Sequence, residues 1–258
     1  AAPHRLGPHS FGPHLRRSLG GAVLALGMLA GCTPAPPGGG VADPYEARNR
    51  EVHAENVRVD RAVIRPVAEA YADVVPAPLR RGLSNASSNL GLPGTVLNDL
   101  LQFRPGDAVV NTVRFAVNST IGLGGLLDPA SQMGLAERPA DFGQTLHVWG
   151  VREGAYLELP LMGPSTERNA VGRVVDVALN PTRLFLEDAG PVRAALGVAS
   201  GLEYRNELAP MLDRVLDTSA DSYAQARLGY IENRRFLIGQ DDEPDYFDPY
   251  EELYGDGF

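Results

Sequence analysis

The chain has 258 residues, of which 44% are hydrophobic and 21% charged, proportions typical of a folded globular protein rather than a disordered or coiled-coil one. Its 23 basic residues are all arginine and face 32 acidic residues, and the resulting net charge of -9 opposes the counterion release that drives nucleic-acid binding. A single cysteine excludes a disulfide framework within the chain and a cysteine-rich metal cage. We therefore expect no nucleic-acid partner.

Residues 1–31 have the pattern of a secretory signal peptide. Arginines without acids precede the apolar stretch Leu19–Ala30, which is shorter than the roughly 20 residues that a membrane-spanning helix needs. The stretch ends in Leu-Ala-Gly followed by Cys32, which resembles a bacterial lipobox, so we predict that Cys32 is the acylated anchor. A chance match in an alanine- and glycine-rich chain is the alternative. Thr33 stands where aspartate would retain such a lipoprotein in the inner membrane, which favours the outer membrane.

A proline- and glycine-rich tether occupies residues 32–42. Asp43-Pro44, with Glu46 three residues after the aspartate, is typical of a helix N-cap and capping box and predicts a helix to about Ile64. Arg65-Pro66 and the later prolines predict breaks between helices. Further helices are expected over Val67–Val74, Leu79–Leu90, Leu92–Leu101 and Pro105–Ile121.

The middle of the chain differs from these helical segments. Gly122–Leu127 combines three glycines with apolar side chains that a loop in water would normally avoid, so we expect an apolar environment around it. Frequent prolines and glycines from Asp141 to Leu161 predict loops, with brief strand pairing around Tyr156–Leu159. Helices are then expected from Pro164 to Leu179 and over 192–201, 203–216 and 219–237, and a disordered acidic tail over 239–258.

The residues after the signal segment offer no catalytic or metal-binding constellation. Only His53 and His147 lie there, without the i, i+4 spacing of a helical metal site. Gly82–Ala86 falls one glycine short of a nucleophile elbow and lies in a helical pattern, and the glycines of Gly122–Leu127 do not match a dinucleotide-binding loop. We therefore predict no enzymatic activity, no cofactor and no metal.

Motifs along residues 43–238 resemble those of the MlaA (VacJ) family of outer-membrane lipoproteins. The matching residues are Asp43-Pro44, Glu46, Asn49-Arg50, Arg65–Ala68, Tyr71, Val75-Pro76, Arg80, Gly82, Ser84-Asn85, Asn98–Gln102, Arg114-Phe115, Asn118–Thr120, Gly122, Gly124-Gly125, Asp128, Asp141–Leu146, Trp149–Val151, Gly154, Tyr156, Leu159–Leu161, Gly163–Thr166, Arg168, Asp217, Ser219, Asp221, Tyr223, Arg227, Tyr230 and Arg234-Arg235. Two departures are Glu51–Asn56, where the family usually has an aromatic run, and Leu92, where it has an acid.

This resemblance implies an all-α, ring-like, membrane-embedded lipoprotein with a loop-rich middle and no substantial sheet. It implies that phospholipids misplaced in the outer leaflet leave through a central channel and pass to a soluble periplasmic carrier, MlaC, while porin trimers hold the ring. We therefore expect a lipid-anchored protein of the outer membrane that faces the periplasm and maintains lipid asymmetry. A structural lipoprotein that binds porins without moving lipid, or a periplasmic lipid hydrolase, would be the alternative.

The glycine-rich segment is the sequence-based candidate for a channel gate. Its glycines adopt left-handed conformations at little cost, so its leucines could swing as an apolar flap, and the alternative is a rigid turn whose glycines permit close packing. The expected gate comprises Gly122, Leu123, Gly124, Gly125, Leu126 and Leu127. Candidate channel-side polar residues are Asn49, Arg114, Asn118 and Asp128, with helix capping as the alternative for Asn118 and Asp128.

Overall fold

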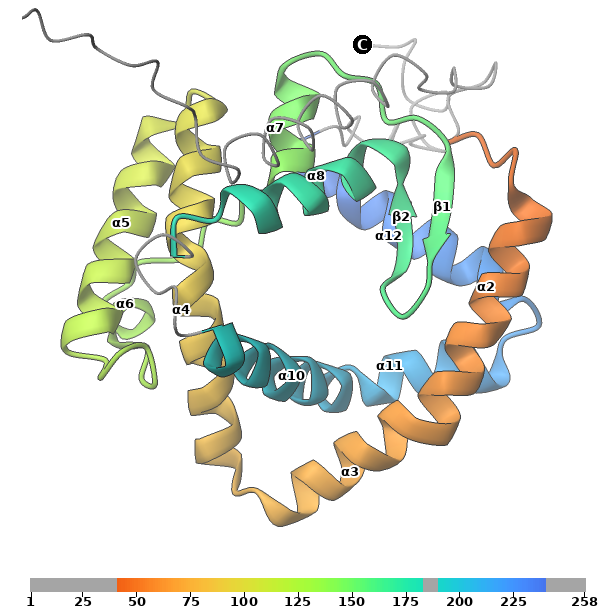
Figure 1. The fold of residues 1–258 in the computed structure, drawn as a ribbon, viewed down its shortest axis with the longest axis horizontal. Helices are drawn as coiled ribbons and strands as arrows, with labels where there is room; N and C mark the ends of the chain where they lie inside the picture. The colour runs from red at the N-terminus through yellow and green to blue at the C-terminus, as the bar shows by residue number, and fades with distance from the viewer. Residues whose placement is uncertain (1–40, 183–189, 240–258) are drawn as a thin grey trace, which may run out of the picture.

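The computed structural model describes residues 41–182 and 190–239. Helices follow one another around an open centre, so that segments far apart in the sequence meet across it (Figure 1). The elements are α2 Glu46–Val59, η1 Asp60–Ile64, α3 Arg65–Val74, α4 Ala77–Leu101, α5 Pro105–Thr120, α6 Pro129–Gln132, α7 Phe142–Val148, β1 Tyr156–Leu159, β2 Gly163–Thr166, α8 Glu167–Leu179, α10 Gly190–Glu207, α11 Ala209–Asp213, η3 Arg214–Thr218 and α12 Ser222–Leu237. The predictions for the signal segment, for Cys32 and for nearly all of the acidic tail lie outside the described residues.

The predicted all-α class is confirmed. Within the described ranges the only sheet is the antiparallel hairpin β1–β2, in which Tyr156 lies opposite Thr166 and Leu159 opposite Gly163. The strand predicted at Tyr156–Leu159 is therefore correct. None of the helices in residues 41–182 and 190–239 is long and apolar enough to cross a bilayer.

The helix break predicted at Arg65-Pro66 is wrong. α2, η1 and α3 form one continuous helical rod. Its middle part, the 5 residues of η1 from Asp60 to Ile64, is π-helical. Pro66 lacks the N–H that would continue the hydrogen-bond ladder, and the wider π turn lies where that interruption occurs. The rod follows the right-hand and lower sides of the ring (Figure 1).

The two helices predicted on either side of Leu92-Pro93 are also one helix, α4. Pro93 removes one backbone hydrogen bond from it. The helix persists because it packs against both α5 and α10 and buries Ala86 and Leu92. Packing against two neighbours therefore outweighs the local preference for a break.

The capping box predicted at Asp43 is wrong as well. α2 begins at Glu46 without a side-chain cap. The Asp43 carboxylate instead accepts hydrogen bonds from Asn49 Nδ2 at 2.8 Å and from Arg227 Nη1 at 2.7 Å, and the Tyr223 hydroxyl also donates to it. Because Tyr223 and Arg227 belong to α12, Asp43 ties the first described residues to the last helix and closes the ring.

The loops predicted from Asp141 to Leu161 include a helix, α7. Asp141 caps α7 by accepting a hydrogen bond from the Gln144 backbone N–H at 2.9 Å. A Cβ atom at Gly143 would lie only 2.3 Å from Asn169 Oδ1 on α8, so glycine is what allows the two helices to meet. The glycine here serves close packing and not chain flexibility.

Helix bounds in the C-terminal half differ from the predictions by a few residues. α8 begins at Glu167 and not at Pro164, because residues 163–166 pair with β1. α10 continues through residue 202, where a break was expected, and ends at Glu207, shortly before Pro210. The last predicted helix, 219–237, corresponds to α12, which is capped by Asp221.

Candidate functional site at the centre of the ring

A cavity of about 850 Å³ lies at the centre of the ring. Side chains from α2, η1, the β1–β2 hairpin, α8, α10, α11, η3 and α12 line it, so no single segment of the sequence contains it. Its volume is within the range of about 300–1,000 Å³ that small-molecule sites occupy. The ring thus encloses a space large enough to hold part of a sizeable ligand.

The cavity wall carries large apolar side chains that remain exposed. Leu161 and Met162, at the turn of the hairpin, are 69% and 68% exposed. Across the cavity, Tyr204 of α10 and Met211 of α11 are 63% and 57% exposed. Apolar groups gathered in an open hollow are unfavourable in water unless a ligand or another apolar surface covers them.

Where α2 meets the β1–β2 hairpin, the cavity wall is polar. The Glu158 carboxylate accepts a hydrogen bond from the Tyr156 hydroxyl at 2.5 Å and lies 3.2 Å from His53 Nδ1. The other ring nitrogen of His53 lies 3.0 Å from Ser222 Oγ on α12. Burial, followed by the hydrogen bond to Glu158, raises the pKa of Tyr156, so this phenol stays protonated and donates to the carboxylate. His53 is therefore a buried polar link between three elements.

Charged side chains join the two π-helical turns beside the cavity. Asp60 of η1 accepts hydrogen bonds from Arg205 Nε at 2.7 Å and Nη2 at 2.9 Å. Asp217 of η3 accepts from Arg61 at 3.0 Å and from Arg65 at 2.8 Å. The hydrogen bond from Arg65 is the largest of the effects that lower the pKa of Asp217. The bonds to Asp217 hold η1 and α3 against η3, and the bonds to Asp60 hold η1 against Arg205 of α10.

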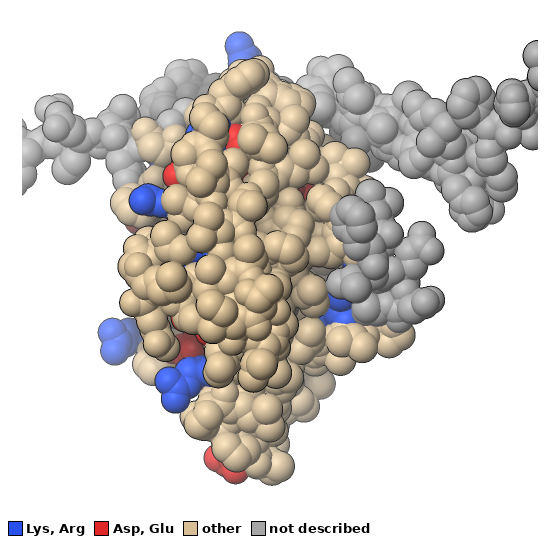
Figure 2. Space-filling model, turned by 90° about the vertical axis from the view of Figure 1, so that its left-hand side faces the viewer, with Lys and Arg blue, Asp and Glu red and all other residues tan. Residues whose placement is uncertain are grey.

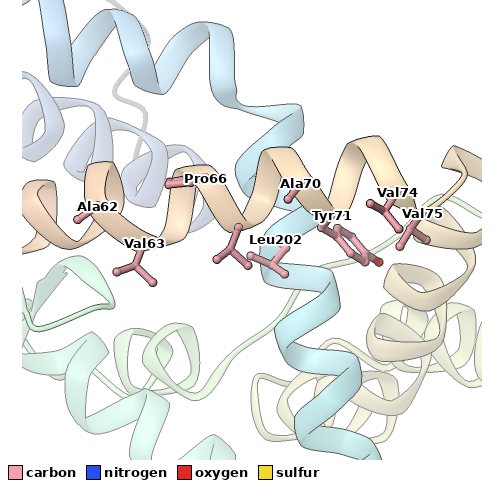
Figure 3. A pocket seen from close by; sticks show the side chains of 9 residues that line it. Ala62, Val63, Pro66, Ala70, Tyr71, Val74, Val75 and Leu202 are labelled. Atoms are coloured by element: carbon pink, nitrogen blue, oxygen red, sulfur yellow. The ribbon is translucent and has the colours of Figure 1, made fainter.

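A second hollow, of about 560 Å³, lies along η1 and α3 (Figure 3). Its lining is apolar apart from the Tyr71 hydroxyl, and α10 contributes only Leu202. It has no charged side chain to orient a ligand. The central cavity, which combines apolar and polar walls, is therefore the better candidate for a binding site.

Comparison with known proteins decides the family. The model of the MlaA lipoprotein family matches residues 41–237. The chain belongs to the MlaA lipoprotein family. Two curated relatives carry the name "intermembrane phospholipid transport system lipoprotein MlaA", and both align over 226 residues, which is 84% of this chain and 87% of the relative. The relative from Shigella flexneri is 36% identical and that from Escherichia coli (strain K12) is 35% identical.

A solved structure supports the same assignment. It is described by the words "structural basis for maintenance of bacterial outer membrane lipid asymmetry", and it matches with a TM-score of 0.68 and 34% identity. The match covers 76% of this chain and 99% of that chain. The resemblance to MlaA proteins inferred from the motifs is thereby confirmed.

In this MlaA-family chain, the predicted gate segment is a tightly bonded turn. The backbone N–H groups of Gly122, Gly124, Gly125 and Leu127 all donate to carbonyls between residues 117 and 122. A Cβ atom at Gly125 would lie 2.5 Å from Asn89 Cβ on α4, and one at Gly122 would lie 2.4 Å from the Asn118 carbonyl oxygen. These contacts favour the rigid, closely packed turn over the swinging flap. None of the six residues of the segment lines the central cavity.

Three of the four candidate polar residues form one hydrogen-bonded cluster around Asp128. Asp128 caps α6 and accepts hydrogen bonds from Asn118 Nδ2 at 2.9 Å and from Arg114 Nη2 at 3.3 Å. Burial raises the pKa of Asp128, but the hydrogen bonds from Ser131 and Asn118 and the charge of Arg114 outweigh it and lower the pKa overall. This cluster holds the α5–α6 connection, and none of its members lines the cavity.

Asn49 has a comparable role at the start of the ring. Its side chain donates to the Tyr156 carbonyl at 3.1 Å and accepts from the Glu158 backbone N–H at 2.9 Å. Asn49 is 3% exposed, so it ties α2 to β1 from within the wall. His147, the other histidine considered, lies 3.4 Å from Arg168, and burial followed by that positive charge lowers its pKa. No cluster of metal ligands occurs in the part of the chain that is described.

The residues that line the cavity were not among those predicted from the sequence. Leu161 ends the stretch interpreted as loop and Met162 follows it, while Met211 and Arg173 look like ordinary residues of helix surfaces. The one available signal was the apolar pair Leu161-Met162 directly after the predicted strand Tyr156–Leu159. Their convergence depends on the closure of the ring, which no local pattern encodes.

Proposed function

We propose that this MlaA-family protein removes phospholipids from the outer leaflet of the outer membrane and passes them through its central cavity to a periplasmic carrier. The observation that carries the proposal is a cavity with exposed apolar walls and a hydrogen-bonded polar wall within one ring. An amphipathic lipid needs both kinds of surface along its path. The names of the relatives, which are intermembrane phospholipid transport lipoproteins, support this function.

The outer surface of the ring supports an embedded position in the bilayer. Phe103 before α5, Val109 of α5 and Met133 at the end of α6 are 83%, 63% and 63% exposed. Figure 2 shows the side of the ring that carries α5 and α6 as a mostly uncharged surface with a few arginines and acids at its margins. Such a surface is disfavoured in water and stable among acyl chains. We propose that the ring lies within the membrane without spanning it by single helices.

The anchor, the partners and the absence of catalysis belong to the same proposal. The several acyl chains of a lipoprotein at Cys32 would hold the ring in the outer membrane, facing the periplasm, since one chain gives only marginal binding. A porin trimer would position it, and a soluble MlaC-like carrier would receive the lipid. Moving a lipid breaks no covalent bond, so the proposed mechanism assigns no residue to catalysis.

The test is the amount of phospholipid in the outer leaflet of intact cells. Removing the gene is expected to raise that amount, and expressing the chain again is expected to restore it. Labelling with an amine-reactive reagent that does not cross the membrane, followed by mass spectrometry, measures exposed phosphatidylethanolamine. An unchanged outer leaflet, in cells where the wild-type protein is abundant and bound to porin, would favour the purely structural alternative.

A further inference from the structure

Arg173 of α8 has an unusual position in the cavity wall. It is the only arginine among the described residues that line the cavity, and its side chain is exposed. Among residues 41–182 and 190–239 it has no ion pair and no hydrogen bond from its guanidinium. Most other described arginines are held by carboxylates or backbone carbonyls, as Arg205 is by Asp60. The positive charge of Arg173 is therefore available to a ligand.

The acids of the cavity wall do not neutralise this charge. Asp60 is occupied by Arg205 and lies 3.5 Å from Arg65, and Glu158 is occupied by Tyr156 and His53. Each carboxylate thus has partners within the wall. An unpaired guanidinium beside apolar walls attracts an anion more strongly than one in bulk water, because the local dielectric is lower.

The apolar side of the cavity lies opposite this arginine. Met211, Leu212 and Leu216 line the cavity from α11 and η3. In Figure 1, α8 and α11 lie on opposite sides of the open centre. A ligand with an anionic end and a long apolar part would place one end at each wall.

We propose that Arg173 binds the phosphate of a phospholipid headgroup while the acyl chains contact the α11–η3 wall. This inference rests on the proposed function and names the residue that recognises the lipid. The planar guanidinium offers paired N–H donors that match two phosphate oxygens, a geometry that a neutral side chain cannot reproduce. The headgroup site would select lipids that carry phosphate over neutral lipids with the same chains.

Photo-crosslinking of two lipids to the full-length, lipidated protein in detergent tests this site. One probe is phosphatidylglycerol with a diazirine in an acyl chain, and the other is a diacylglycerol with the same chain and no phosphate. Mass spectrometry counts the adducts on residues of the cavity wall. The proteins compared are the wild type, Arg173→Gln, Arg173→Lys and Arg152→Gln. Arg152 is the matched control, because it is exposed and without a partner in the described chain but does not line the cavity.

The phosphatidylglycerol adduct is expected to fall about tenfold in Arg173→Gln, since a hydrogen bond to a charged group contributes about 1.5 kcal/mol or more. Arg173→Lys is expected to keep most of the adduct, and Arg152→Gln all of it. The diacylglycerol adduct should be equal in all four proteins, which also shows that the cavity stays folded. Equal phosphatidylglycerol labelling of the wild type and Arg173→Gln would overturn the headgroup site alone. No adduct from either probe in the wild type would overturn the lipid path itself, and with it the proposed function.

A competition experiment distinguishes a site for a lipid headgroup from a site for free phosphate. Excess inorganic phosphate is added to the wild type before irradiation. The phosphatidylglycerol adduct is expected to persist, because the acyl chains supply binding that the free ion lacks. Loss of the adduct would assign Arg173 to a free phosphate site and contradict the inference.

Discussion

The polar cluster and glycine turn that join α5 to α6 differ from the central cavity in how their side chains are satisfied. Between α5 and α6, Arg114 and Asn118 donate hydrogen bonds to Asp128, and the glycine turn packs against α4. In the cavity, Leu161, Met162 and Met211 stay exposed around an open space. The polar cluster and the glycine turn thus stabilise the fold, whereas the cavity offers a surface for contact with something outside the chain. Substitutions in the two regions should therefore affect different measurements.

The largest effect on stability is expected from Asp128→Ala. The change leaves the buried Arg114 guanidinium without its carboxylate, and breaking such a pair costs about 3 kcal/mol or more. Urea unfolding followed by circular dichroism measures this loss. Asp107→Ala is the matched control on α5, because the side chains of its partners Arg104 and Arg138 are 38% and 53% exposed, and it should cost less than about 1 kcal/mol. Equal losses from the two variants would contradict the assigned role of the cluster.

A somewhat smaller effect is expected from Gly125→Ala in the glycine turn. Gly125 has φ +94, and its Cβ would collide with Asn89, so the cost should be about 2–3 kcal/mol. Gly124→Ala is the control: Gly124 has φ +77 with nothing within 4 Å, so only backbone strain of about 1 kcal/mol remains. Urea midpoints of the two variants give the comparison. If both variants were as stable as the wild type, the turn would be loose, and the hypothesis of a moving gate would regain support.

The smallest effect on stability is expected from Asp221→Asn, at the surface where α2 meets α12. The hydrogen bond from Arg50 is the main cause that lowers the pKa of Asp221 to about 2. Since the unfolded value is near 3.9, this pair stabilises the fold above about pH 4, and the contribution is lost as the pH falls towards 2. Asp221→Asn keeps the α12 cap and removes the charge. The small difference in urea midpoint between this variant and the wild type should shrink over that pH range, and a constant difference would contradict the pairing.

The sequence predicts the fold wherever a local signal agrees with packing. Pro105 starts α5 as expected, and Tyr156–Leu159 is a strand. Prediction fails at Pro66 and Pro93, because local breaking signals compete with contacts to distant helices. Family motifs predict the ring but not its binding surface. Motif residues such as Asn49 lie within the wall, where they are needed for folding.

The cavity residues could not be predicted for a different reason. Arg173 is one arginine among many on helical segments, and only the ring places it in the cavity and leaves it without a partner. Leu161 and Met162 become part of an apolar cavity wall only together with Met211. Met211 is about fifty residues away in the chain and reaches the same cavity only when the ring closes. Long-range placement of this kind is decided by tertiary contacts and not by periodicity.

The central claim is that lipid passes through the cavity, and filling the cavity tests it most directly. Gly229 of α12 lines the cavity and has nothing within 4 Å of an added Cβ, so Gly229→Trp should occupy the space without disturbing the fold. Gly197→Trp on α10 is the matched control, because that exposed glycine also has nothing within 4 Å but does not line the cavity. The measurement is outer-leaflet phospholipid in cells that express each variant at equal levels. We expect phospholipid to accumulate with Gly229→Trp as it does without the gene, and to stay at the wild-type amount with Gly197→Trp. Wild-type amounts with both variants would contradict passage through the cavity.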